Sequence, residues 1–140
     1  MRGDYLHTRV LVAQIVNLLR VFGAVVHREH YMRLGESFGY ADVLARLGSY
    51  TIVCEAELSP DRARKDVEKA VALRADLLLI VVPNKRLEVS VNKHLRACNT
   101  DLDAPDWLEI WVLPLGPALQ RLRERCHLMT GLNVPTTSSH

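Results

Sequence analysis

The chain has 140 residues, of which 49% are hydrophobic and 24% are charged. These values are close to the average for a single soluble globular domain and exclude a disordered chain, a coiled coil and a collagen. Eighteen Lys and Arg against sixteen Asp and Glu give a net charge of +2, so a polyanion would have to be bound by a local patch rather than by the overall charge.

The first part of the sequence predicts one helix followed by three strands. Apolar residues recur at helical spacing over about 5–22, and Gly23 is placed to end this helix. Segments rich in Val and Tyr then predict strands over about 24–32, 40–47 and 50–58. The turns between them are short, so we expect the three strands to form an antiparallel meander.

The second part predicts alternating helices and strands. Ser59 and Pro60 are suited to the cap and the first position of a helix, and the six aliphatic residues of 77–82 are typical of a central strand covered on both faces. In chain order we expect a helix over about 60–75, a strand over 77–82, a short helix over 91–98, a strand over 107–113 and a helix over 117–129.

The order α-β-β-β-α-β-α-β-α predicts an α/β fold in which a central mixed sheet of about five strands is flanked by helices. We expect one domain over 1–133 and a flexible polar tail over 134–140. The N-terminus lacks a signal-peptide pattern, and no stretch reaches the about 20 apolar residues that a bilayer requires.

The three cysteines, Cys54, Cys98 and Cys126, are an odd number without metal-type spacing. This favours buried thiols in a reducing compartment. Together with the absence of a signal-peptide pattern, it leads us to expect a cytoplasmic protein that does not contact a membrane.

Two carboxylates, Glu55 and Glu57, interrupt an otherwise apolar predicted strand. Alternate side chains of a strand share a face and lie about 7 Å apart, and two like charges there are costly without a compensating cation. Asp42 lies on the preceding strand, which the hairpin places beside Glu55. The three carboxylates would form an all-oxygen site suited to Mg²⁺ or Mn²⁺. A solvated outer face of the sheet is the alternative.

From about Leu6 to Pro83 the chain resembles the PD-(D/E)xK nuclease superfamily, whose core has the order α-β-β-β-α-β. Residues 40–44, Tyr-Ala-Asp-Val-Leu, are similar to the segment that carries an Asp at the start of the second strand. Residues 54–58, Cys-Glu-Ala-Glu-Leu, are similar to the (D/E)-x-K motif of the third strand. The resemblance implies a restriction-endonuclease-like fold.

The resemblance also implies a metal-dependent nuclease that hydrolyses DNA phosphodiester bonds, with RNA left open as a substrate. Asp42 and Glu55 would then hold Mg²⁺ or Mn²⁺, and Glu57 would complete the metal shell or accept the proton of the attacking water. By analogy with such nucleases, we expect a homodimer.

One departure from the motif is that Glu57 stands where the family usually has Lys. A lysine of the following helix can replace it in the superfamily, and Lys65 and Lys69, one turn apart, are the candidates; we assign Lys65 to the catalytic group. We assign four further cations to nucleic-acid phosphates: Arg28, Arg33, Arg62 and Lys69. An ordinary solvated helix face, with Lys65 paired to Asp61, is the alternative.

Glu57 also favours a second hypothesis, a catalytically inactive module of the nuclease fold that binds nucleic acid or a protein partner. An unrelated small α/β binding domain with exposed Glu55 and Glu57 is the third. His27 and His30 would point to opposite faces of a strand, which argues against a shared zinc site. Trp107 and Trp111 would share one face of the last strand and favour core packing or a dimer contact.

Overall fold

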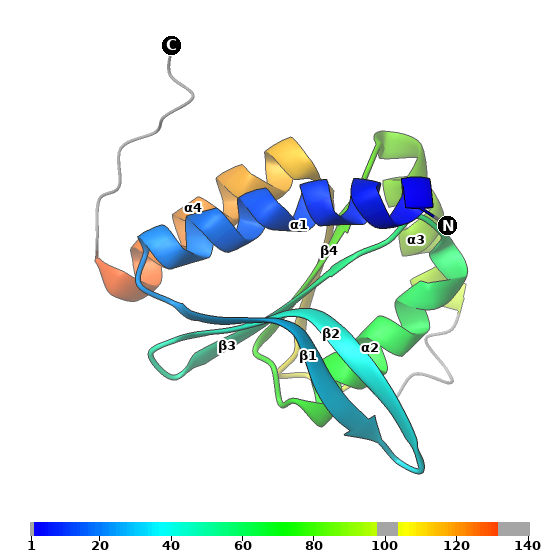
Figure 1. Cartoon of the computed structure of the whole chain (residues 1–140), viewed down its shortest axis with the longest axis horizontal. Coiled ribbons are helices and arrows are strands. Elements are labelled where there is room, and N and C mark those ends of the chain that lie inside the picture. The colour runs from blue at the N-terminus through cyan, green and yellow to red at the C-terminus, as the bar shows by residue number, and fades with distance from the viewer. Residues whose placement is uncertain (1, 98–103, 132–140) are drawn as a thin grey trace.

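The computed structural model describes residues 2–97 and 104–131. A five-stranded mixed sheet of order β1-β2-β3-β4-β5 lies at its centre (Figure 1). The strands are β1 (Val25–Leu34), β2 (Ser37–Leu47), β3 (Tyr50–Ala56), β4 (Leu77–Val82) and β5 (Glu109–Pro114). The pairs β1–β2 and β2–β3 are antiparallel, whereas β4 and β5 run parallel to β3. The predicted α/β class and order of elements are therefore confirmed.

Helices cover both faces of the sheet. They are α1 (Arg2–Val21), α2 (Ala63–Ala72), α3 (Lys85–Ala97) and α4 (Leu115–Thr130), and the short 3₁₀ helix η1 (Pro60–Arg62) precedes α2. Figure 1 shows α1 and α4 side by side on one face, while α2 and α3 lie on the other. Among the described residues, no helix has both the length and the apolar character needed to cross a membrane.

The sheet separates two hydrophobic cores because side chains alternate between its faces. In β4, Leu79 packs with α1 and α4, whereas Ile80 packs with α2 and α3. All six residues of β4 are buried, which confirms the prediction of a central strand covered on both faces. Gly23, with φ of +88°, ends α1 in the left-handed conformation, as predicted from its position.

The hairpin of β1 and β2 extends beyond the rest of the sheet. Its pairing continues from Val25–Arg46 to Leu34–Ser37, but β2 pairs with β3 only as far as Val43–Cys54. The outer part of β2 therefore has β1 as its only strand neighbour, and the hairpin projects from the body of the molecule (Figure 1). We had predicted that the second strand begins near residue 40, whereas it begins at Ser37 because the turn is shorter.

Local predictions at two other element ends were wrong. Ser59 and Pro60 do take the predicted cap and first positions of η1, but the Ser59 side chain bonds no helix N–H, because its hydroxyl donates to the Asp61 carboxylate instead. The last strand begins at Glu109, so Trp107 does not share a strand face with Trp111. Trp107 lies in a turn that precedes β5 and is half exposed, whereas Trp111 is buried.

The prediction that His27 and His30 lie on opposite faces was also wrong, since their ring centroids are 6.1 Å apart. Glu29, between them, has φ of +51°, and this left-handed residue interrupts the alternation of the strand. Among the described residues, neither histidine belongs to a group that could hold a metal ion. The predicted tail of 134–140 and Cys98 lie outside the described residues.

Candidate metal centre

The site begins where β2 and β3 separate. The backbone pairing of β2 with β3 ends at Val43–Cys54. Beyond this pair, two hydrogen bonds from backbone N–H groups to side-chain carboxylates link the two strands. The backbone N–H of Asp42 donates to Oε2 of Glu55 over 3.1 Å, and the N–H of Ala56 donates to Oδ2 of Asp42 over 2.9 Å. These reciprocal bonds hold the two carboxylates in the gap between the strands.

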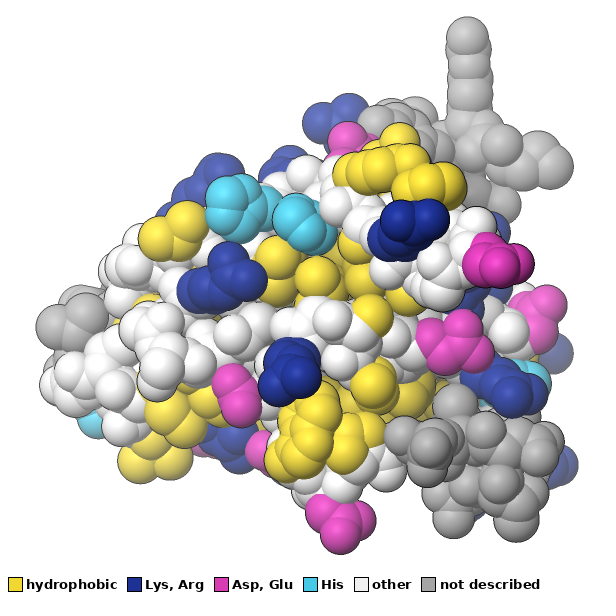
Figure 2. All heavy atoms as spheres, turned by 90° about the horizontal axis from the view of Figure 1, so that it is seen from below, with side chains coloured by type: hydrophobic (Ala, Val, Ile, Leu, Met, Phe, Trp, Pro, Cys, Tyr) yellow, Lys and Arg dark blue, Asp and Glu magenta, His cyan; other side chains and the backbone are white. Residues whose placement is uncertain are grey.

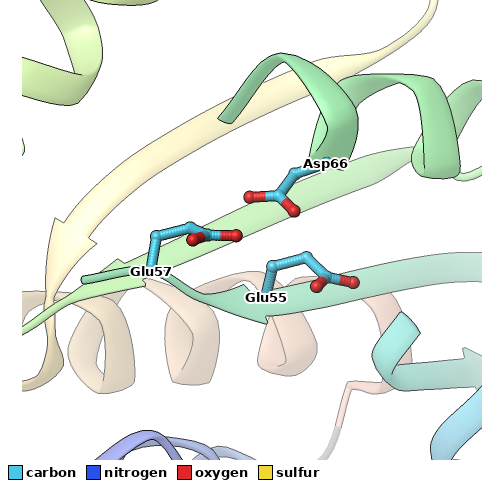
Figure 3. A group of neighbouring side chains, drawn as sticks. All are labelled: Glu55, Glu57 and Asp66. Carbon is cyan, nitrogen blue, oxygen red and sulfur yellow. The ribbon is translucent and has the colours of Figure 1, made fainter. Parts of the chain in front are cut away.

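Helix α2 adds a third element to the site. Asp66 lies on the face of α2 that packs against the sheet and is 1% exposed. One carboxylate oxygen from each of Glu55, Glu57 and Asp66 lies within 4.8 Å of the other two. Figure 3 shows the side chains of Glu55 and Glu57 directed from the strand toward Asp66 on the helix.

Glu57 lies just beyond the end of β3 but keeps the strand direction. Its backbone N–H donates to the carbonyl oxygen of Val81 over 3.0 Å, so the chain still follows β4 at this point. Glu57 therefore remains on the same face as Glu55, as the strand period predicts. Both side chains are buried, with exposed fractions of 6% and 2%, so the predicted alternative of a solvated outer face is wrong.

Lys69 supplies a positive charge inside this acidic group. Its Nζ lies 3.3 Å from Oε1 of Glu55 and 3.9 Å from Oδ1 of Asp66, and the side chain is only 13% exposed. A Cβ added at Gly39 would lie 3.8 Å from the Cε of Lys69. The lysine thus reaches the carboxylates across a position of β2 that has no side chain.

Burial raises the pKa of all four carboxyl groups. It is the largest cause for Asp42, Glu57 and Asp66, and for Glu55 it raises the pKa from 4.5 to about 8. The charge of Asp42 adds to the effect on Glu55, whereas Lys69 opposes it. The acidic group therefore has more negative charge than one lysine balances, and it favours bound protons or a further cation.

The acidic group also has an unused ligand atom. Oδ2 of Asp66 is buried and accepts no hydrogen bond from the part of the chain that the structure describes. A buried acceptor without a partner is unfavourable unless a ligand or a proton satisfies it. In the metal-free protein a hydrogen bond between the Glu57 and Asp66 carboxyl groups contributes to the raised pKa of Asp66. Carboxylate oxygens from β2, β3 and α2 form a hard, all-oxygen donor set, which fits Mg²⁺ or Mn²⁺ better than a soft metal.

The structure thus brings Asp42, Glu55 and Glu57 together with Lys69, but not with Lys65. Lys65 is exposed and lines a groove between α2 and the β1–β2 turn. Arg28 and Arg33 are exposed on β1, and Arg62 in η1 is exposed but near enough to lower the pKa of Glu57.

Sequence reasoning did not find Asp66. A signal was present, because Asp66 follows Ala63 by three residues and precedes Ala70 by four. It therefore falls within the apolar stripe of the predicted helix. Glu29 was missed as well, and its charge contributes to the raised pKa of Asp42.

Comparison with known proteins gives no further assignment. The sequence matches no model of a known protein family, and neither characterised proteins nor solved structures give a significant match.

Proposed function

We propose that the protein is a metal-dependent nuclease with a restriction-endonuclease-like fold, which hydrolyses DNA phosphodiester bonds with Mg²⁺ or Mn²⁺ as cofactor. The observation that carries this proposal is the buried group of Glu55, Glu57 and Asp66, with Lys69 between Glu55 and Asp66 and the half-buried Asp42 bonded beside Glu55. The order of the first helix and the first four strands, with α2 between β3 and β4, supports the same assignment.

The raised pKa values favour a metal ion over a purely structural role. Carboxylates that retain protons at neutral pH release them when a divalent cation replaces the protons. Glu55, Glu57 and Asp66 would each supply one oxygen to the ion, and Asp42, which is bonded beside Glu55, would add a ligand from β2. When bound, the ion lowers the pKa of a coordinated water and stabilises the negative oxygens of the phosphate.

Residues of the chain would then supply a positive charge, a proton acceptor and a phosphate contact. Lys69, held against Glu55, would supply the positive charge that the motif lysine provides in the superfamily. Glu57 would accept the proton of the attacking water through the carboxylate oxygen that does not hold the ion. Arg62, exposed at the start of α2, would hold a phosphate next to the site.

A plasmid-nicking assay tests this function. Supercoiled DNA is incubated with the protein and Mg²⁺, Mn²⁺ or EDTA, and the variants Asp42→Asn and Glu55→Gln are compared with Glu68→Gln. Glu68 is the matched control because it lies on α2, and its side chain is 54% exposed. We expect metal-dependent nicking by the wild type and by Glu68→Gln, and none by the two site variants.

The lysines provide a second comparison within the same assay. Lys69→Met should abolish nicking, whereas Lys65→Met should not, because only Lys69 contacts the carboxylates. Cleavage that persists in Asp42→Asn would point to a contaminating nuclease and contradict the proposal.

The inactive nuclease-like module remains the second candidate, favoured by Glu57 at the position of the motif lysine. It predicts calorimetric heat of Mg²⁺ binding that Glu55→Gln abolishes, but no cleavage of any DNA by the wild type. Absence of both heat and cleavage would leave only the unrelated binding domain.

A further inference from the structure

The projecting end of the β1–β2 hairpin carries three exposed aromatic rings. Tyr31, Phe38 and Tyr40 are 54%, 53% and 56% exposed. Tyr31 lies in the middle: its ring is stacked on Phe38 at 5.4 Å with an interplanar angle of 14°, and it meets Tyr40 edge-on at 5.1 Å. We call these three residues the aromatic platform. Cross-strand aromatic pairs stabilise a hairpin, but that role does not require so much exposure.

The platform is aromatic and basic rather than aliphatic. The guanidinium carbon of Arg33 lies 5.7 Å from the centroid of Phe38. The aliphatic residues that alternate with the rings, Met32 and Leu34, pack into the core with α2.

The cations of the same strand are available to a ligand. Within the described part of the chain, neither Arg28 nor Arg33 forms an ion pair with a carboxylate. Seen from below, the side toward which the hairpin projects carries hydrophobic, basic and histidine side chains close together (Figure 2). The guanidinium group of Arg33, which lies over Phe38 and has no carboxylate partner among the described residues, is complementary to a ligand with flat bases and negative phosphates.

The platform adjoins the acidic site along β2 but lies on the other face of the hairpin. Tyr40 precedes Asp42 by two residues on β2, a distance of about 7 Å along a strand. The rings point away from α2, because Met32 and Leu34, which alternate with them, pack with that helix. A strand of nucleotides bound on the rings would therefore have to pass the open side of β2, next to Asp42, to reach the carboxylates.

We propose that the aromatic platform binds unpaired nucleotides of DNA, with bases stacked on Tyr31 and its neighbours and phosphates on Arg33. This inference rests on the proposed nuclease function and narrows its substrate to DNA with a single-stranded segment. Duplex DNA does not fit, because its bases are stacked on one another and offer no free face to a ring, whereas each unpaired base does.

Fluorescence anisotropy in EDTA tests this binding without cleavage. The ligands are a labelled single strand of about 12 nucleotides and the same sequence as a duplex. The variants are Tyr31→Leu, which keeps an apolar side chain but removes the ring, and Tyr31→Phe, which keeps the ring. The matched control is Trp107→Leu, since Trp107 is 51% exposed and precedes β5 at the opposite edge of the sheet.

We expect the single strand to bind more tightly than the duplex, and Tyr31→Leu to weaken its binding about 5- to 100-fold. Tyr31→Phe and Trp107→Leu should bind like the wild type. Equal affinity of Tyr31→Leu and wild type for the single strand would overturn the inference, as would equal affinity of the wild type for both ligands. A wild-type dimer in sedimentation that Tyr31→Leu converts to a monomer would instead make the platform an interface between copies, and would also overturn it.

The two proposals can fail separately. Asp42→Asn, which tests the nuclease, should keep full affinity for the single strand in EDTA, since Asp42 is not part of the platform. Binding that depends on Tyr31 without metal-dependent nicking would refute the nuclease and leave the platform in place. Nicking that is unaffected by Tyr31→Leu on a single-stranded substrate would refute the platform and leave the nuclease.

Discussion

Replacing Glu55 by Gln removes a buried negative charge and keeps the size of the side chain. Glu55 is 2% exposed, and burial together with the charge of Asp42 raises its pKa to about 8. Gln resembles the protonated acid, because its amide oxygen can still accept the hydrogen bond from the N–H of Asp42. We therefore expect Glu55→Gln to stabilise the metal-free protein at alkaline pH.

The sign and the size of the effect follow from linkage. Because the pKa of Glu55 is higher in the folded than in the unfolded state, the folded state binds more protons between pH 4.5 and about 8. The free energy of unfolding of the wild type therefore falls as the pH rises through this range, and the loss is complete above it. At 1.36 kcal/mol per pH unit, the loss due to Glu55 is about 5 kcal/mol. Asp42, Glu57 and Asp66, whose pKa values are also raised, act in the same direction.

Urea denaturation in EDTA at pH 5 to 9 measures this difference, with the fluorescence of the buried Trp111 as the signal. Glu55→Gln and the wild type should have similar stability at pH 5, and the variant should be more stable by several kcal/mol at pH 9. Glu68→Gln, which removes an exposed charge, should show no such change. A difference between Glu55→Gln and wild type that does not vary with pH would refute the reasoning.

Three further predictions concern the metal, the lysine and the edge of the sheet. Mg²⁺ at about 100 times its Kd should stabilise the wild type by about 2.7 kcal/mol, and Asp66→Asn should lose this gain, as measured by thermal unfolding with and without the ion. Lys69→Met should destabilise the metal-free protein by about 3 to 5 kcal/mol at pH 8, because it leaves buried carboxylates unpaired, whereas Lys65→Met should change stability by less than about 0.5 kcal/mol. Arg125 donates hydrogen bonds to both carboxylate oxygens of Glu109 and stacks on Trp111. Because solvent screens Glu109, Arg125→Met should lower the free energy of unfolding, measured by urea denaturation, by only about 1 kcal/mol. A decrease of more than about 3 kcal/mol would contradict this.

The order of the elements could be predicted because the strongest signals in the sequence are local. A run of six aliphatic residues, as in β4, is typical of a strand that is covered on both faces. Gly23 adopts the left-handed backbone conformation, which glycine takes more readily than other residues. The errors lie at the ends of elements, where a single contact determines which residues begin or cap the helix or strand. Ser59, for example, bonds Asp61 rather than a helix N–H, and the sequence is compatible with both.

The acidic site could be predicted only in the part that depends on strands. Two carboxylates at alternate positions of one strand share a face wherever the strand lies, so Glu55 and Glu57 could be grouped from the sequence. Which lysine joins them depends on the rotation of α2 about its axis, which the packing of Ala63, Val67 and Ala70 sets. Lys65 and Lys69 have the same local context, and only this packing separates them.

Asp42 has two roles, and a single substitution can remove both of them at once. Its carboxylate is a candidate metal ligand, and it also accepts the hydrogen bond of the Ala56 N–H where β2 and β3 separate. Asp42→Ala removes both roles and should destabilise the fold by about 1 to 3 kcal/mol, since it leaves a partly buried N–H without a partner.

Asp42→Asn separates these roles, because its amide oxygen can still accept from Ala56 while its charge is lost. We expect Asn to keep the stability of the wild type in EDTA or to exceed it at alkaline pH, since Asp42 also has a raised pKa. Both variants should lose metal-dependent cleavage, so the loss in Asp42→Asn cannot be attributed to unfolding. If Asp42→Asn cleaves DNA like the wild type, the carboxylate serves only to join the strands, and the proposed nuclease is contradicted.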